Sequence, residues 1–374
     1  MNAHGKQPTQ GVWDARHNNF DALRLLLALL VLASHCVPLA TGSEETEWVA
    51  RWTHHQLTGG AISVDLFFVM SGFMITASME RSRSAWQFAQ RRITRIYPAF
   101  IVCALLGFFV FARIAEAKLL PNTAARAGDF LLQTMRLREF TYAHAFASNP
   151  YPGQAINGSV WSIQYECWCY VGVMLLGVAG LLRKRAWPLI CLIASVLVSV
   201  LFLVRGWVLG GKFLGVLFGS PQLWARLLPY YLAGVVFYLY RRHIPHRAGL
   251  AVLCVTAMLL AAKLQYGVAM IFPFAGAYLA FYLAYAAWLP LKQAGRFGDF
   301  SYGLYLYAFP VQQTLVWLHR GSIAPLRLFV EATSLTLLLA IASWYGVERR
   351  FLRRGRGHEL IAQVVREAAP KATI

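Results

Sequence analysis

Apolar residues are concentrated in long runs along this chain, and polar residues are mostly confined to the connections between the runs. The first run, 20–40, is long enough to cross a bilayer as an α-helix, because a span needs ~20 mostly apolar residues. The ten predicted spans are 20–40, 60–79, 97–114, 160–182, 187–204, 224–240, 247–264, 268–289, 299–318 and 324–347. The pattern therefore predicts an all-α fold, a polytopic membrane bundle of about ten transmembrane helices.

One further apolar segment does not fit this count. Residues 206–220 are apolar but short and rich in glycine. A full span here would move every later basic connection to the other side of the membrane, against the charge pattern described next. We therefore interpret 206–220 as a re-entrant or interfacial segment.

Composition agrees with a membrane protein. The chain is 58% hydrophobic and only 14% charged, whereas soluble domains carry about 25% charged residues.

The net charge of +19 suggests nucleic-acid binding at first sight, but the basic residues lie between the apolar spans. They follow every even-numbered span: Arg81, Arg83, Arg91, Arg92 and Arg95; Arg183, Lys184 and Arg185; Arg241, Arg242 and Arg247; Lys292 and Arg296; Arg349, Arg350, Arg353, Arg354 and Arg356. Under the positive-inside rule both termini are cytoplasmic.

This topology divides the chain into three parts. Residues 1–18 and 351–374 are predicted cytoplasmic tails, and 19–350 form the transmembrane domain. The first run could be mistaken for a signal peptide. We interpret it as a retained helix, because Arg24 interrupts its apolar stretch and many further spans follow it. A long connection, about 115–159, lies on the outer side.

Two ionisable residues in the first span are the strongest indication of chemistry. Arg24 and His35 are eleven positions apart, about three helical turns, so they share one face with ~16 Å of axial separation. Charged groups are costly in hydrocarbon and usually line a bundle interior or a polar cavity. The alternative is that His35 only hydrogen-bonds a neighbouring helix.

Two carboxylates are predicted at the depth of His35. Asp65 and Glu166 each lie five residues inside the outer end of a span, as His35 does, which places all three ~8 Å below the outer boundary. A carboxylate neighbour orients an imidazole and raises its basicity, as a general base requires. Sequential helices usually pack together, so Asp65 is the expected direct partner of His35, and Glu166 is expected nearer the acceptor. Either carboxylate could instead form a structural pair.

A second group of charges lies at the cytoplasmic start of the third span. Arg91, Arg92 and Arg95 bring several guanidinium groups together, and Arg92 and Arg95 are neighbours on a helix. Planar guanidinium groups bind phosphate oxygens bidentately. These arginines are therefore candidates for binding a phosphate-bearing donor. The alternative is topological charge or contact with anionic lipid.

Five sequence segments together resemble the membrane acyltransferase family 3. They are 19–24 (NFDALR) with His35, 60–73 (GAISVDLFFVMSGF), 91–98 (RRITRIYP), 159–166 (SVWSIQYE) and 300–306 (FSYGLYL). They occur in order across nearly the whole chain. One departure is visible: the family often has a histidine before the proline that here is Pro310, whereas this chain has Ala308 and Phe309.

The resemblance implies a ten-helix enzyme of the bacterial cytoplasmic (inner) membrane. Such an enzyme moves an acyl group, commonly acetyl, from cytoplasmic acyl-CoA (acetyl-CoA) to a hydroxyl of an envelope glycan or polysaccharide. It makes His35 and Arg24 the expected essential pair and places Arg92 and Arg95 on the donor side. Asp65 and Glu166, from their depth, and Arg91, from its place in the arginine group, are the further candidate site residues. The expected partners are acetyl-CoA, the glycan acceptor and membrane lipids, without nucleic acid and without a metal.

Two other classes remain open from the sequence. A secondary transporter would also place ionisable residues inside a helical bundle, but paired half-helices are not evident here. A non-catalytic membrane protein of envelope assembly is the third possibility. The outer connection contains a mixture of residues able to bind a sugar, which is equally typical of a solvated loop: Arg136, Arg138, Glu139, Tyr142, His144 and Tyr151.

Overall fold

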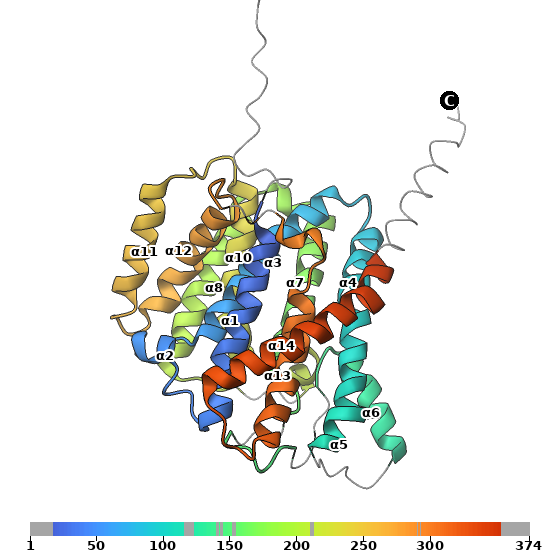
Figure 1. Cartoon of the computed structure of the whole chain (residues 1–374). Helices are drawn as coiled ribbons and strands as arrows, with labels where there is room; N and C mark the ends of the chain where they lie inside the picture. Colours follow the sequence, from blue (N-terminus) through green and yellow to red (C-terminus); the bar gives the residue numbers. More distant parts are fainter. Residues whose placement is uncertain are drawn as a thin grey trace, which may run out of the picture. The chain divides into compact units, whose positions relative to one another are not determined.

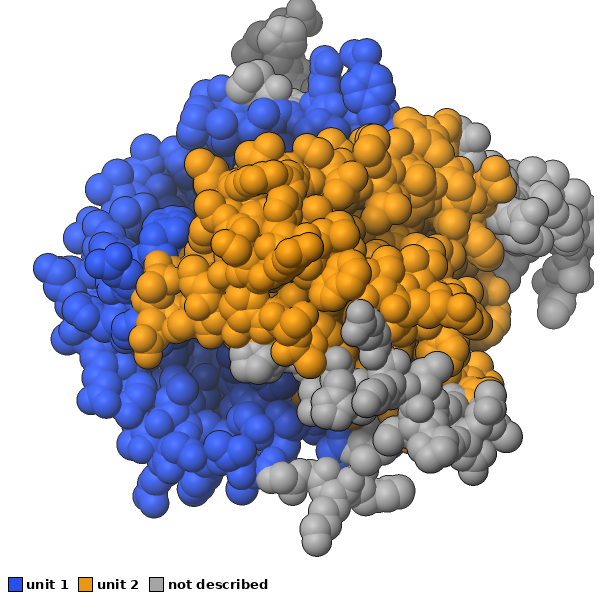
Figure 2. Space-filling view, turned by 60° about the horizontal axis from the view of Figure 1, so that its bottom comes forward, with its two compact units in different colours: residues 1–27, 48–77, 179–298 blue, residues 28–47, 78–178, 299–374 orange. Residues whose placement is uncertain are grey.

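The computed structural model describes residues 18–115, 123–139, 142, 145–151, 155–209, 213–289, 291 and 293–352. Within these ranges the chain is helical and forms no strand, which confirms the predicted fold class (Figure 1). The predicted tails and the basic residues Lys292, Arg353, Arg354 and Arg356 lie largely or wholly outside the described residues. The contacts divide the chain into two compact units, 1–27, 48–77 and 179–298, and 28–47, 78–178 and 299–374 (Figure 2).

Each of the ten predicted spans coincides with a helix. The helices in question are α1 (Phe20–Thr41), α3 (Gly59–Arg81), α4 (Ala85–Leu106) with its continuations η1 (Gly107–Phe111) and α5 (Ala112–Ile114), α7 (Trp161–Val178), α8 (Ala186–Arg205), α10 (Pro221–Tyr240), α11 (Ala248–Ala261), α12 (Gly267–Ala284), α13 (Ser301–Leu318), and α14 (Pro325–Ser343) with η4 (Trp344–Glu348). Six of the helical stretches among the described residues are long and apolar enough to cross a membrane: 20–41, 59–81, 85–114, 186–205, 267–284 and 325–352. The chain is an integral membrane protein, and the count of ten spans and the side of the termini stay predictions.

The connections hold further short helices. They are α2 (Trp48–Trp52), α6 (Thr123–Met135), α9 (Phe213–Phe218), η2 (Leu181–Arg183) and η3 (Ala294–Arg296). Helix α9 has six residues and is far too short to span a bilayer, which agrees with the interpretation of 206–220 as a segment that does not cross. Helix α6 was not predicted. Its 13 residues include a glycine and two charges, so its hydropathy is low, but it packs against α4.

In the first unit, glycines allow two helices to approach at the level of their backbones. A Cβ atom on Gly72 of α3 would lie 2.1 Å from the carbonyl oxygen of Tyr231, and one on Gly234 of α10 would lie 1.9 Å from that of Val69. Neither position has room for a side chain. Small residues at such contacts are typical of membrane helices, which gain packing rather than hydrophobic free energy by associating.

In the second unit, α13 is the central helix. Almost all of its residues are buried, and it packs along α14, where Gly303 lies against Ala340. The rest of its surroundings come from the C-terminal half of α1, from α4 and from α7. The hydroxyl groups of Tyr305 in α13 and Ser162 in α7 form a hydrogen bond of 2.7 Å. The environment of His35 is therefore set largely by what lies along α13.

Candidate active site

His35 lies on α1 in the second unit and is half-buried. Its ring meets the ring of Phe309 edge-on, with 5.4 Å between centroids and 85° between planes. Its Nδ1 atom is buried and has no hydrogen-bond partner among the residues that the structure describes. A buried polar atom without a partner is unfavourable by ~1–3 kcal/mol and is usually found where a ligand or water completes the site. The imidazole is thus held by packing, with one nitrogen available.

Gln312 fixes the helical turn that carries His35. The side chain of Gln312 is fully buried on α13, and its Nε2 donates to the carbonyl oxygen of Leu32 (2.8 Å) and to Sγ of Cys36 (2.9 Å). Because these two acceptors lie on either side of His35 along α1, the contact fixes that turn. The sequence analysis did not single out Gln312, although a glutamine inside an apolar span is a visible signal.

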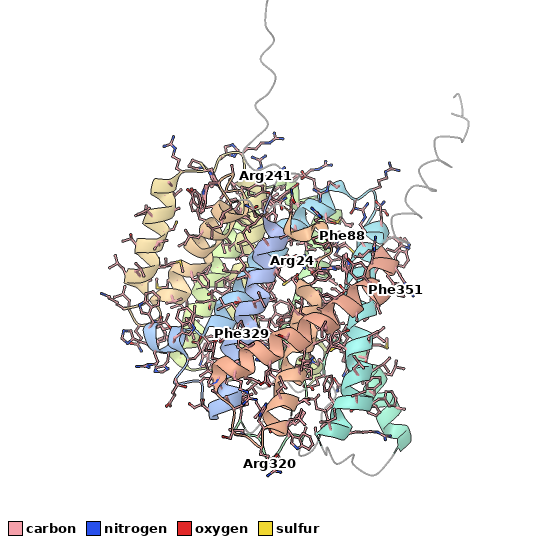
Figure 3. The ribbon with its side chains drawn as sticks, in the orientation of Figure 1. Arg24, Phe88, Arg241, Arg320, Phe329 and Phe351 are labelled. Carbon is pink, nitrogen blue, oxygen red and sulfur yellow. The ribbon has the colours of Figure 1, made fainter. Side chains whose placement is uncertain are left out.

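Arg24 lies on the same helix, in the part that belongs to the first unit (Figure 3). Pro38 of α1 has no N–H, so the carbonyl oxygen of Ser34, four residues earlier, loses its donor within the helix. The predicted separation of about three turns between Arg24 and His35 stays a prediction.

Asp65 has an ion-pair partner that the sequence analysis missed. Its side chain is fully buried on α3, and Oδ1 accepts from Arg226 of α10 at 3.2 Å. Arg226 also donates to the carbonyl oxygen of Ala61 at 3.4 Å, so it connects the two helices. Asp65 Oδ2 has no hydrogen-bond partner among the described residues. Asp65 and His35 belong to different units, and their direct pairing stays a prediction.

Glu166 lies in the second unit on α7, where it accepts a hydrogen bond of 2.7 Å from Tyr170 one turn later. It also interacts electrostatically with Tyr302 of α13, which stacks under Arg95. The contacts of Glu166 therefore connect it to the environment of Arg95. Its proposed role toward the acceptor stays a prediction.

Arg95 is held by two carboxylates from the far end of the sequence. Its guanidinium pairs closely with Asp299, and it pairs with Glu348 at 3.2 Å. The Glu348 side chain is only 2% exposed, so its charge needs this partner. Asp299 also accepts from the backbone nitrogen and hydroxyl of Ser301 at the start of α13. The cluster connects the N-terminal half of α4 to the start of α13 and to η4.

The other two arginines of the group differ from Arg95. Arg92 lies over the ring of Phe88, 5.9 Å from its centroid, and both stand on α4 near its N-terminus (Figure 3). Arg91 is the adjacent residue on the same helix. An anion at Arg95 must compete with Asp299 and Glu348 for the guanidinium group. The role of Arg91, Arg92 and Arg95 toward a phosphate-bearing donor stays a prediction.

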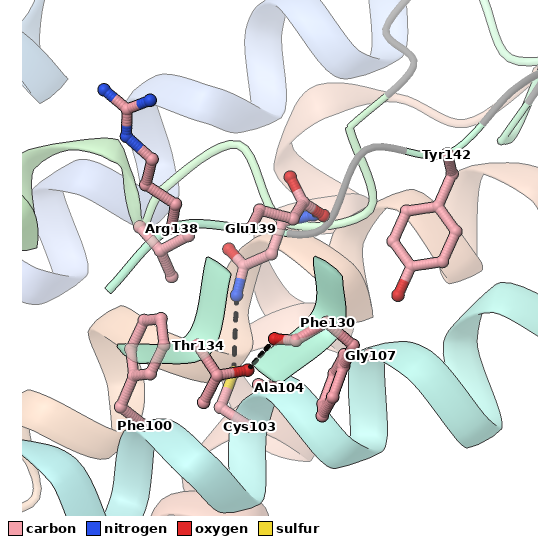
Figure 4. A pocket seen from close by; sticks show the side chains of 11 residues that line it. Phe100, Cys103, Ala104, Gly107, Phe130, Thr134, Arg138, Glu139 and Tyr142 are labelled. Atoms are coloured by element: carbon pink, nitrogen blue, oxygen red, sulfur yellow. Dashed lines mark hydrogen bonds between the residues drawn. The ribbon is translucent and has the colours of Figure 1, made fainter. Parts of the chain in front are cut away.

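A small cavity lies in the second unit (Figure 4). It is lined by α4 and α6, by residues that follow α6, and by the segment just before α7. The lining residues are Phe100, Cys103, Ala104, Gly107, Phe130, Thr134, Arg138, Glu139, Tyr142, Asn157 and Val160. The Glu139 carboxylate accepts from the backbone amides of Ile156 and Asn157. Burial raises the pKa of Glu139 from 4.5 to about 8, although those two amides oppose the shift.

Three of the six outer residues named from the sequence, Arg138, Glu139 and Tyr142, therefore line one cavity. Arg138 donates from Nε to Gln164 of α7 at 2.6 Å, which fastens the connection to that helix. Arg136 and Tyr151 are described but do not line the cavity, and His144 lies outside the described residues.

Comparison with known proteins places these residues in a family context. The family model described as an acyltransferase domain matches residues 17–345. A protein named O-acetyl transferase from Shigella phage Sf6 is 30% identical over 352 residues, covering 91% of this chain and 97% of its own length. Nodulation protein 10 of Rhizobium leguminosarum bv. viciae is 28% identical (89% and 92%). The exopolysaccharide production protein ExoZ of Rhizobium meliloti (strain 1021) is 28% identical (86% and 98%). No solved structure matches.

The Arg95 cluster predicts a stability effect. Arg95→Ala removes the ion-pair partner of Asp299 and Glu348, a change that typically lowers the free energy of unfolding by about 3–5 kcal/mol for a buried pair. We expect a clearly lower thermal unfolding midpoint of the full chain in detergent, and partial recovery when Glu348→Gln is added. Arg83→Ala, at an exposed arginine of the same side, is the matched control. Equal midpoints for Arg95→Ala and Arg83→Ala would contradict the pairing.

The buried Glu139 carboxyl predicts a dependence of stability on pH. The unfolded chain loses this proton near pH 4.5 and the folded chain only near pH 8, so the stabilisation present below pH 4.5 is lost as the pH rises to 8. Glu139→Gln keeps an oxygen that accepts from the amides but has no charge to bury. The thermal midpoint of this variant relative to wild type should therefore rise steadily across that interval. A difference that does not vary with pH would show that Glu139 ionises normally.

Proposed function

Because the chain belongs to the acyltransferase family whose model covers 17–345, we propose that it is a membrane O-acyltransferase. In this proposal it moves an acyl group, in the simplest case acetyl, from cytoplasmic acyl-CoA to a hydroxyl of a cell-envelope polysaccharide. The names of two relatives, O-acetyl transferase and exopolysaccharide production protein, support the class of reaction and of acceptor. The bacterial cytoplasmic membrane is the proposed location.

The observation that carries the proposal is the state of His35. A half-buried imidazole in an apolar helix has an Nδ1 atom with no partner among the described residues, while Gln312 and Phe309 hold its surroundings in place. A purely structural histidine in a membrane bundle is expected to hydrogen-bond a neighbouring helix. An imidazole nitrogen without such a bond is suited to accept the proton of an incoming hydroxyl.

The proposed reaction has a simple balance. His35 takes the proton from the acceptor hydroxyl, the oxygen attacks the thioester carbonyl, and the carbon–sulfur bond breaks. The proton then passes from the imidazole to the thiolate of coenzyme A. In the second route His35 attacks the thioester first and carries the acyl group to the hydroxyl. Intact-mass analysis of the chain after mixing with acetyl-CoA alone separates the routes, since only the second adds an acetyl group to the protein.

The donor side is assigned to the arginines of α4. Arg91 and Arg92 are proposed to bind the phosphates of acyl-CoA, because guanidinium groups bind phosphate oxygens bidentately. Arg95 is proposed to keep this part of α4 in place through Asp299 and Glu348. Arg24, on the same helix as His35, is proposed as the second essential residue.

A first prediction tests the base. His35→Ala removes the proton acceptor and should lower acyl transfer by at least ~100-fold without changing the amount of inserted protein. Membranes that carry the full chain are incubated with [14C]acetyl-CoA, and the label in envelope polysaccharide is counted. His319→Ala, at a histidine that pairs with Glu331 near the end of α13, is the control and should retain activity. Near-normal transfer by His35→Ala would remove His35 from the mechanism.

A second prediction concerns the donor. Arg92→Ala should raise the KM for acetyl-CoA roughly tenfold, because one charge-assisted contact to phosphate is worth ~1.5–3 kcal/mol. The same assay is run across acetyl-CoA concentrations, with Arg83→Ala as the control. An unchanged KM would leave Arg92 a topological charge. Uptake of labelled substrate without incorporation, in either experiment, would favour a secondary transporter.

A further inference from the structure

A proline in α13 leaves a carbonyl group without its helical donor, and the outer connection supplies the replacement. Pro310 has no N–H, so the carbonyl oxygen of Leu306, four residues earlier, loses its hydrogen bond within the helix. Asn157 donates from Nδ2 to this oxygen at 2.7 Å, and Cys103 of α4 donates from Sγ at 3.3 Å. A residue from the connection before α7 thus satisfies the backbone of the helix that carries Phe309.

Asn157 is itself held at several points. Its backbone nitrogen donates to the Glu139 carboxylate, and its Oδ1 accepts from the backbone nitrogen of Ser159 at 3.2 Å. Its side chain is buried and lines the cavity shown in Figure 4, where Arg138, Tyr142 and Cys103 are the other titratable groups around Glu139. These bonds fix the position of the next residue, Gly158.

Gly158 has no space for a side chain because the ring of Phe309 occupies it. A Cβ atom on Gly158 would lie 2.7 Å from Cζ of Phe309, and 2.9 and 3.2 Å from the two neighbouring ring atoms. Contacts under 3.0 Å require something to move. The ring of Phe309 therefore rests directly on the backbone at Gly158, and its opposite contact is the edge-on packing with His35 at 5.4 Å.

We propose that Asn157 and Gly158 are positioning residues for acyl transfer: they set the ring of Phe309 and, through it, the orientation of the His35 imidazole. This inference rests on the proposed function of His35. A catalytic imidazole is usually oriented by a hydrogen bond to one of its nitrogens. Here Nδ1 has no such partner among the described residues, and aromatic packing supplies the orientation instead.

The proposal makes the effect of Gly158→Ala specific. The added methyl group pushes the Phe309 ring, so turnover should fall by about tenfold to a hundredfold, as expected for a displacement of ~1 Å at a reacting group. The KM for acetyl-CoA should stay at its wild-type value, because the arginines of α4 do not change. Gly172→Ala is the matched control, since a Cβ on Gly172, in α7, meets no atom within 4 Å.

Two readouts separate positioning from general damage. The rate at which diethylpyrocarbonate modifies His35 in the full chain in detergent, followed by mass spectrometry, should change severalfold in Gly158→Ala. The rate at His319 in the same molecules should not change, and it serves as the internal reference. In a double-mutant cycle, Gly158→Ala should have little further effect on turnover once Phe309→Leu is present, because the glycine acts through that ring.

The outcomes distinguish this inference from the proposed function. An altered His35 modification rate in Gly158→Ala supports the positioning, even if His35→Ala proves to retain transfer and the proposed function fails. If His35→Ala abolishes transfer while Gly158→Ala leaves both turnover and His35 modification at wild-type values, the positioning is overturned. It is also overturned if Gly158→Ala lowers turnover equally in the wild-type and Phe309→Leu backgrounds.

Discussion

The cost of an unpaired charge in an apolar helical bundle governs the arrangement of the ionisable residues in this chain. In the first unit, buried Asp65 is matched by Arg226. In the second, Arg95 is matched by Asp299 and Glu348. Asp65 Oδ2 and His35 Nδ1 are both buried and lack a hydrogen-bond partner among the described residues. We assign the chemistry to His35 because an imidazole nitrogen without such a partner can accept the proton of a hydroxyl.

The same requirement applies to the backbone. Proline removes a hydrogen bond from a membrane helix, and water is not available in the bilayer core to replace it. In α13 the carbonyl oxygen of Leu306 is satisfied by Asn157 from the connection before α7. A backbone group of a buried helix therefore depends on a segment outside the helix, and that segment also contacts the ring beside His35. The hydrogen bond to the Leu306 carbonyl and the position of the Phe309 ring beside His35 therefore depend on the same segment.

The sequence was sufficient to predict the helices, because a membrane helix must be apolar over its whole length and the pattern is long and regular. It also singled out His35 and Arg95 as candidates, since ionisable residues stand out in or beside such runs. It did not predict α6, a polar helix of 13 residues whose stability comes from packing on α4. The positive charge at Arg226 lay inside a predicted span, and that signal was available but not used.

The partners of these residues were beyond sequence reasoning for a physical reason. Arg95 meets Asp299 and Glu348 across 204 and 253 positions of the chain, and no local periodicity encodes such contacts. The sequence treated Arg91, Arg92 and Arg95 as equivalent members of one group. The three-dimensional contacts show that Arg95 pairs with two carboxylates of the protein, whereas phosphate binding by Arg91 and Arg92 is a proposal.

We propose that this protein, without a second enzyme, catalyses the formation of an ester bond between an acyl group and a hydroxyl. The most direct test uses the purified full chain in liposomes, with [14C]acetyl-CoA enclosed and extracted envelope polysaccharide outside. Mass spectrometry and label counting then locate the acetyl group. If the protein is an O-acyltransferase, O-acetyl ester should appear on the polysaccharide outside the liposomes, in an amount that increases with the enclosed acetyl-CoA. Labelled material that crosses the membrane while the polysaccharide stays unmodified would contradict it.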